Sequence, residues 1–167
     1  PKDFNGQIIS DDVVLELLKS ANFAPSHKMT QPWHFKIFSR FSKNILLDEI
    51  FRINERITEN KKNKLQANFE KTSHVICICM KRSKNLLPEW EEIASTAMAV
   101  QNLWMACVGS EIGGYWSTPK YIEKLNAFLG LREEDKCLGF FYLGAHKSTR
   151  SRDINRASIK DKIEWFS

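Results

Sequence analysis

The chain has 167 residues, 43% of them hydrophobic and 27% charged, a size and composition that fit one globular domain with its own core rather than a disordered protein. Its formal net charge is +5, but the basic residues are scattered and are not interleaved with aromatic residues, which disfavours a nucleic-acid-binding surface. The apolar runs are too short to cross a membrane and PKDFNGQIISDD has no signal-peptide pattern, so we expect no membrane association and a cytoplasmic location.

The first predicted helix begins after Ser10, which can cap it, and carries two acidic residues in its first turn. An apolar stripe continues to Ala21, and Pro25 ends the helix because the residue before a proline disfavours helical geometry. Residues 24–35, APSHKMTQPWHF, then concentrate two prolines, two histidines and a tryptophan in one connection. Its last part, WHFKIF, predicts a strand.

The middle of the chain predicts a long helical region and a buried strand. Residues 42–71 are charged and mostly helical, with an apolar stripe through Leu46 and Ile50 and a break near Asn60. The continuous apolar run HVICICM at 74–80 is typical of a central strand buried on both faces. The four cysteines lack CxxC or Cys/His ligand spacing, so we expect buried free thiols and no metal site.

The second half contains an unusually apolar helix. Pro88 is an accepted first residue for a helix, and residues 93–108 are apolar nearly all round. Such a helix needs cover on every side, either as the central helix of the domain or against another subunit. We further expect a short helix from Thr118 to Gly130 and a last central strand at CLGFFYLG, which gives one α+β domain over residues 1–167. The tail from residue 145 to residue 167 is polar with spaced apolar residues, and we expect it to dock on its own or a partner subunit.

The chemistry of the 24–35 connection is ambiguous when it is taken alone. Ser26 and His27 are a possible nucleophile and base, but sequence neighbours rarely reach triad geometry and no GxSxG motif is present. The histidines have no third ligand at metal spacing, and the chain has no GxGxxG dinucleotide fingerprint. Gly113 and Gly114, taken alone, are compatible with a plain helix terminator.

Four stretches, taken in order, resemble the nitroreductase family. APSHKMTQPWHF is similar to its flavin-binding loop, LPEWEEIASTAMAVQNLWMACVGSEIGGYW to its central helix and the glycine turn after it, and EEDKCLGFFYLG to its last core strand. PKDFNGQIISDDVVLELLKSANFAPS resembles the approach to the loop. The similarity covers nearly the whole chain and is greatest to the small short-chain NAD(P)H nitroreductase branch, which has Pro-x-His-Lys in the loop.

This resemblance implies a nitroreductase-like α+β fold: a central mixed, mainly antiparallel sheet flanked by helices, in a homodimer with an extended C-terminal tail. The family binds FMN at the subunit interface. The resemblance places Pro25, Ser26 and His27 against the partner's FMN and places Trp116, Ser117 and Thr118 along the flavin. It also implies that Gly113-Gly114 let the backbone approach a flat ring. It assigns no catalytic acid or base to a side chain.

The implied activity is that of an FMN-dependent NAD(P)H oxidoreductase with a ping-pong hydride mechanism. Nitroaromatic, quinone or related electron-poor small molecules are the implied acceptors. A non-catalytic flavin-binding protein on the same fold is the alternative. The family's Arg-Arg-Ser phosphate grip would align ahead of Pro1, so we expect an N-terminal segment to be missing, and Phe23 replaces an arginine of close relatives.

Overall fold

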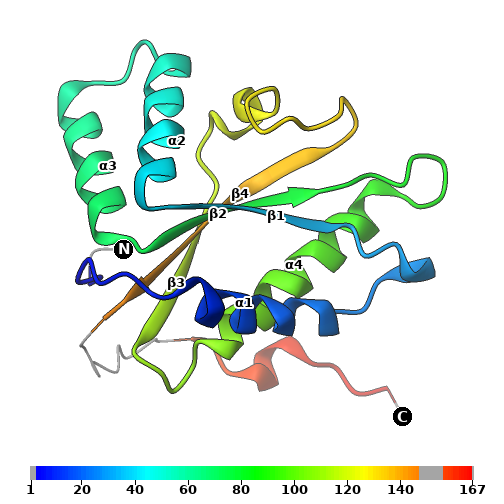
Figure 1. The fold of residues 1–167 in the computed structure, drawn as a ribbon. Coiled ribbons are helices and arrows are strands. Elements are labelled where there is room, and N and C mark those ends of the chain that lie inside the picture. The colour runs from blue at the N-terminus through cyan, green and yellow to red at the C-terminus, as the bar shows by residue number, and fades with distance from the viewer. Residues whose placement is uncertain (1–2, 147–155, 167) are drawn as a thin grey trace.

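The computed structural model describes residues 3–146 and 156–166, which form a sheet between two helical layers (Figure 1). The described strands are antiparallel to their neighbours, in the order β1-β2-β4-β3, which confirms the α+β fold. The strands are β1 (Trp33–Ser39), β2 (His74–Met80), β3 (Ile112–Ser117) and β4 (Lys136–Ala145). The α-helices are α1 (Asp11–Lys19), α2 (Arg40–Ile53), α3 (Glu59–Lys71) and α4 (Glu89–Ala106), and the 3-10 helices are η1 (Ser20–Phe23), η2 (His27–Met29), η3 (Ile122–Leu125) and η4 (Ile159–Lys162).

Strand β2 is the buried centre of the fold, as its sequence predicts. All seven of its residues are buried, and it pairs with β1 on one side and with β4 on the other. Alternate side chains point to opposite faces of a strand, so Cys77 and Cys79 lie in one core while Ile76 and Ile78 lie in the other. One short sequence therefore supplies both hydrophobic cores.

The two faces of the sheet are covered by different parts of the chain (Figure 1). Helices α2 and α3, together with the segment around η3, cover the face that contains Cys77 and Phe140. Helices α1 and α4 cover the face that contains Ile78 and Phe141. The proposed site depends on this division, because the loop before β1 and the end of β3 both lie next to the α4 layer.

Two helical predictions need correction. The region predicted as helical from residue 42 begins earlier, at Arg40, and is divided over residues 54–58 rather than near Asn60. Residues 118–130, predicted as a short helix, form only η3 and turns. Leu125 and Leu129 of this segment are buried against the sheet, so tertiary packing rather than helical hydrogen bonding fixes its path.

The cysteines are buried and free, as expected. Cys79 lies opposite Cys137 in the β2–β4 pairing. Hydrogen bonding to Cys137 and burial together raise the pKa of the Cys79 thiol, and burial raises the pKa of Cys107 to about 11. Both groups are therefore held as thiols at neutral pH.

The described part of the C-terminal tail leaves its apolar side chains in solvent. Trp165 and Phe166 are 89% and 91% exposed, and Ile159 and Ile163 are also exposed. Ile154, another apolar residue of the predicted docking tail, lies outside the described residues. Among the described helices, none combines the length and the apolar character that a membrane crossing requires.

Candidate functional site

The loop before β1 is held in an unusual backbone conformation. Lys28, Met29 and Gln31 have φ values of 52°, 54° and 43°, in the left-handed region that non-glycine residues rarely adopt. Each such residue costs on the order of 1 kcal/mol, so the surrounding contacts have to stabilise the loop. One of these contacts is internal, because the Gln31 backbone N–H donates to Ser26 Oγ over 3.1 Å. No sequence signal predicts this geometry, since none of the three residues is glycine.

Both ends of the loop are fixed to the body of the domain. Trp33 Nε1 donates to Asn22 Oδ1 over 3.0 Å, which joins the start of β1 to η1. The Lys81 backbone N–H donates to the Pro32 carbonyl over 2.8 Å, which joins the loop to the end of β2. Pro32 is buried, in agreement with a structural role for this residue. The loop is a rigid support that presents residues 26–31 outward.

His27 is oriented by a carboxylate from α4. Its Nδ1 lies 2.6 Å from Glu91 Oε2, and the His27 side chain is 57% exposed while that of Glu91 is 20% exposed. A carboxylate acceptor favours a proton on Nδ1, which leaves Nε2 at the exposed edge of the ring. The sequence does not single out Glu91, because an acidic residue in the first turn of a helix is already explained by the helix dipole.

The other predicted flavin residues lie at and beyond the end of β3. Trp116 is half-buried, and its Nε1 donates to the Leu138 carbonyl over 3.2 Å, so the indole packs in the core beside α4. Ser117 pairs with Phe140 on β4, and Thr118 follows immediately after the strand. The glycine at position 139 permits this close packing, because a Cβ there would lie 2.5 Å from the Ser117 carbonyl oxygen.

Gly113 and Gly114 form neither a turn nor a helix terminator. Both lie inside β3, paired with β4, and α4 has already ended at Ala106. A Cβ on Gly114 would lie 2.0 Å from Cζ of Phe141. The flat ring that this glycine accommodates is therefore one of the chain's own phenylalanines, which is sufficient reason for a glycine at this position.

The structure does not place the two groups of predicted flavin residues side by side. Pro25, Ser26 and His27 precede β1, and residues 116–118 end β3, and these two strands are opposite edges of the described sheet (Figure 1). Three strand intervals separate the edges, which is about 14 Å at the usual spacing. Within one chain, each group is held by its own partners.

Helix α4 carries an exposed apolar surface beside these groups. One side of the helix is buried against the sheet, through residues that include Val100 and Leu103. The opposite side exposes large apolar residues, namely Ile93, Met98, Trp104 and Met105, and Val108 in the turn after the helix is also exposed. The described chain thus leaves much of the predicted all-round apolar helix without cover.

Comparison with known proteins agrees with this architecture. The model of the family described as the nitroreductase family matches residues 1–145. The Escherichia coli K12 protein YdjA, provisionally named an NAD(P)H nitroreductase, is 30% identical, with 90% of this chain and 85% of the relative covered. The Bacillus subtilis protein YfhC, with the same provisional name, is 21% identical over 97% of this chain and 87% of the relative.

Solved structures show the same fold. The crystal structure of a nitroreductase-like family protein from Bacillus cereus superposes with a TM-score of 0.85 at 23% identity, covering 99% of this chain and 90% of that one. The FMN-dependent nitroreductase NfnB from Mycobacterium smegmatis, in complex with NADPH, gives a TM-score of 0.74 at 17% identity, covering 98% and 92%. The family match over most of the chain, the curated relatives and the common fold agree, and the chain belongs to the nitroreductase family.

Proposed function

We propose that this protein is an FMN-dependent NAD(P)H oxidoreductase that acts as a homodimer and reduces nitroaromatic, quinone or related electron-poor small molecules. The observation that carries the proposal is the joint exposure of the His27 loop and of the apolar side of α4. The loop presents polar groups outward, and the helix beside it presents a surface suited to a second subunit.

A second subunit also accounts for the separation of the two residue groups. Each chain offers one group before its edge strand β1 and one at the end of its other edge strand β3, and these two strands lie about 14 Å apart across three strand intervals. In the proposed dimer, residues 25–27 of one chain complete a site that contains residues 116–118 of the other. This arrangement gives two equivalent sites, as two-fold symmetry requires.

The residues present fit a flavin. The Ser26 hydroxyl, whose oxygen already accepts from Gln31, is available to donate to ring or ribityl oxygens. The exposed Nε2 of His27 is available to accept a hydrogen bond from a ribityl hydroxyl or a ring N–H. The exposed apolar side chains of α4, such as Trp104, offer surface for the dimethylbenzene part of the ring. When bound, FMN supplies the chemistry, accepting a hydride from NAD(P)H and passing reducing equivalents to the acceptor.

The chain's own residues act by position rather than by proton transfer. The strained loop holds Ser26 and His27 in place before any ligand arrives, so binding does not have to order them. Glu91 fixes the orientation of the imidazole. Neither residue needs to exchange a proton during hydride transfer, which depends on the approach of the reacting atoms to about 3–3.5 Å.

Three measurements on the full-length protein test the proposal. We expect purified protein to show the absorption of bound flavin and to sediment as a dimer. We expect NADPH or NADH to bleach that absorption under anaerobic conditions, and a nitroaromatic or a quinone to restore it. Bound flavin that neither nucleotide reduces would instead establish the non-catalytic flavin-binding alternative. A stable monomer that binds no flavin would overturn both.

A further inference from the structure

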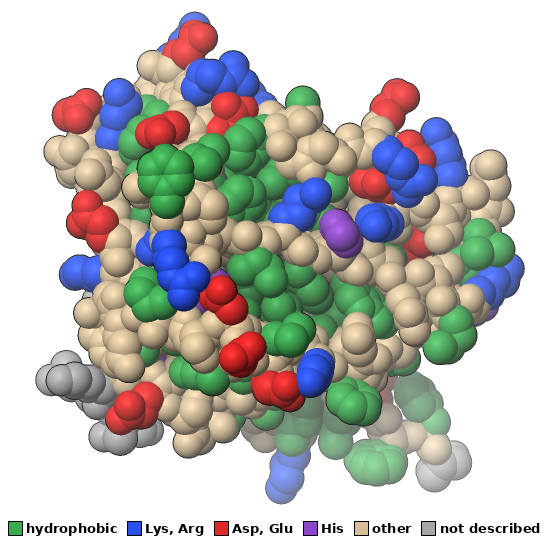
Figure 2. Space-filling view, in the orientation of Figure 1, with side chains coloured by type: hydrophobic (Ala, Val, Ile, Leu, Met, Phe, Trp, Pro, Cys, Tyr) green, Lys and Arg blue, Asp and Glu red, His purple; other side chains and the backbone are tan. Residues whose placement is uncertain are grey.

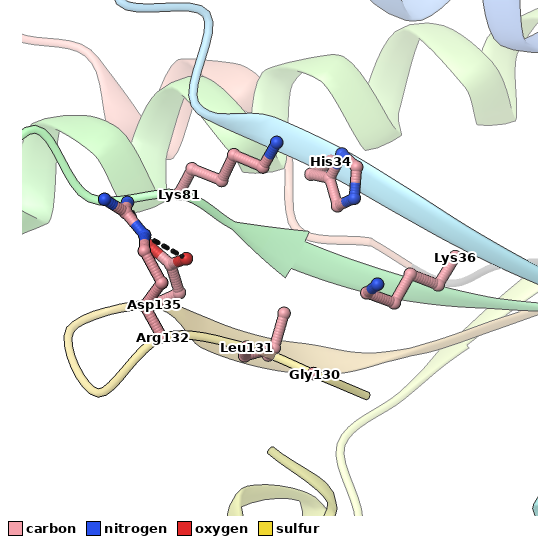
Figure 3. A pocket seen from close by; sticks show the side chains of 7 residues that line it. All are labelled: His34, Lys36, Lys81, Gly130, Leu131, Arg132 and Asp135. Carbon is pink, nitrogen blue, oxygen red and sulfur yellow. Dashed lines mark hydrogen bonds and ion pairs between the residues drawn. The ribbon is translucent and has the colours of Figure 1, made fainter. Parts of the chain in front are cut away.

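A cavity lies on the opposite face of the sheet from α4. It has a volume of about 430 Å³ and is lined by His34, Lys36, Lys81, Gly130, Leu131, Arg132 and Asp135. His34 and Lys36 alternate with Phe35 along β1, so they point away from the α4 core that Phe35 contacts. Figure 3 shows His34, Lys36 and Lys81 on one side of the cavity and the segment 130–135 on the other.

The only carboxylate lining this cavity is already neutralised. Asp135 is buried, and it accepts from Arg132 Nη2 over 2.7 Å and from Arg132 Nε over 2.9 Å. It also accepts from the Arg82 backbone N–H over 2.9 Å. Arg132 makes a further ion pair of 3.1 Å with Glu134. The Arg132–Asp135 pair itself contributes almost no net charge to the cavity, and Glu134, which is not among the lining residues, adds one negative charge beside it (Figure 3).

Two lysines in the cavity remain uncompensated. Lys36 and Lys81 have no ion-pair partner among residues 3–146 and 156–166, although Lys36 is half-buried on the sheet. His34 lies between them, and burial first, then the charges of Lys81 and Lys36, lower the pKa of its imidazole. Figure 2 shows basic side chains gathered on the surface over β1. The cavity is thus a concave site with an excess of positive charge.

We propose that this cavity binds a small phosphomonoester, with its dianionic phosphate between Lys36 and Lys81 and its organic part against Gly130 and Leu131. Two ammonium groups match the charge of a phosphate dianion, and each forms a charge-assisted hydrogen bond to it. The volume of about 430 Å³ exceeds what an inorganic phosphate needs and lies in the range of small-molecule sites. The site is separate from the proposed flavin residues and does not depend on the proposed oxidoreductase activity.

The imidazole of His34 lines the cavity, so its NMR resonances can report ligand binding there. We expect ribose 5-phosphate or AMP, added at constant ionic strength to the protein as purified, to shift the His34 ring resonances saturably in proton NMR. The His34 assignment comes from the His34→Gln variant. A bound dianion opposes the field of Lys36 and Lys81, so the pKa of His34 should rise on binding. Adenosine, which lacks the phosphate, should produce no saturable shift.

Substitution of the lysines tests the assignment. We expect Lys36→Gln and Lys81→Gln each to weaken binding of ribose 5-phosphate about tenfold, the effect of one charge-assisted hydrogen bond. The matched control is Lys64→Gln on α3, an exposed lysine remote from the cavity, which should bind as the native protein does. Thermal denaturation of all three variants excludes misfolding as the cause.

The measured affinities distinguish a phosphomonoester site from a site that binds any phosphate. Saturable binding of ribose 5-phosphate that is at least about tenfold tighter than that of inorganic phosphate supports the phosphomonoester site. Equal affinities, or no saturable shift up to about 10 mM, would overturn it. Release of bound FMN by the added phosphate would also overturn it, because the cavity would then be part of the flavin site. Loss of binding in the Lys64→Gln control would mean that only general positive charge is measured.

Discussion

The two faces of the sheet differ in how completely the chain covers them. On the α2/α3 face, Leu46, Ile50 and Phe69 are buried against the sheet, and the segment around η3 closes the rest. On the α4 face, the helix buries one side and leaves Met105 56% exposed on the other. The α2/α3 side of the sheet, the finished face, therefore has a largely covered core. The α4 side, the open face, ends at an exposed apolar surface.

This difference indicates which face the proposed dimer would use. The α2/α3 layer exposes few large apolar side chains, Phe41 and Ile45 of α2, whereas a more extensive apolar surface such as that of α4 is typical of an obligate interface. The open face also carries the His27–Glu91 pair, which joins the loop to α4. Assembly and ligand binding thus converge on one face in the proposed dimer, and substitutions on the two faces should therefore differ in their effects.

The largest effect is expected from a charge on the open face. Met105→Glu would bury an unpaired carboxylate in the proposed interface, which costs several kcal/mol and should weaken dimerisation by about a thousandfold or more. Ile45→Glu on α2 is the matched control, because Ile45 is a similarly exposed apolar residue, at 45%, on the finished face. Sedimentation over a range of concentrations measures both. Equal weakening by the two variants would remove the distinction between the faces.

The next effect tests the packing beneath the open face. Gly114→Ala places a Cβ 2.0 Å from the Phe141 ring, and we expect the free energy of unfolding to fall by about 3 kcal/mol, as in other overpacked cores. Gly130→Ala is the control: its Cβ would meet nothing within 4 Å, and its φ of 58° costs only about 1 kcal/mol. Denaturant unfolding measures both. Phe141→Leu should restore part of the stability of Gly114→Ala, and no restoration would contradict the proposed clash.

These glycines mark the limit of prediction from sequence. The apolar run at 74–80 predicts β2 correctly, because burial on both faces leaves a continuous signal. From sequence alone, the pair Gly113-Gly114 predicts a turn. Nothing in the local sequence indicates that the ring of Phe141, 27 residues after Gly114, occupies the position of a Gly114 Cβ. The exposed side of α4 follows from its all-round apolar composition.

The candidate site was predictable only in part. Resemblance to the family selects Ser26 and His27 as candidates, but the positive φ values of Lys28 and Gln31 depend on how the loop is fixed at both ends. Glu91 could not be singled out, because its pairing with His27 spans 64 residues of sequence. Long-range contacts of this kind are set by the fold rather than by any local pattern.

A smaller effect concerns the α1 layer of the open face. His74 is buried, its Nε2 lies 3.2 Å from Asp11 Oδ1, and its Nδ1 faces Ser73 Oγ, while Arg40 and Lys43 add positive charge nearby. Burial lowers its pKa despite the favourable Asp11 carboxylate. The unfolded chain then binds the proton more tightly, so stability is full above the usual pKa of 6.5 and falls as the pH drops below it.

Denaturant unfolding between pH 8 and pH 5, in steps of about half a unit, measures this dependence. The variant His74→Gln keeps a hydrogen-bonding side chain without the titration, so its stability should vary less over the same range. Asp11 titrates lower, because its hydrogen bond to His74 and the charge of Arg40 lower its pKa, and its contribution is lost only under more acidic conditions. A variant that loses stability as steeply as the native protein would assign the effect to other groups.

The smallest expected effect distinguishes a role of His27 in binding FMN from a role in catalysis. A hydrogen bond accepted by its exposed Nε2 contributes about 1 kcal/mol, so His27→Ala should weaken FMN binding about fivefold to tenfold. Glu91→Gln, which removes the carboxylate that orients the ring, should weaken FMN binding less. His34→Ala, on the finished face, is the control and should leave FMN affinity unchanged. At saturating FMN, NADPH should reduce the flavin of His27→Ala at close to the native rate, since no proton passes through this ring. A loss of about a hundredfold in that rate, with the dimer intact, would instead make His27 a catalytic residue.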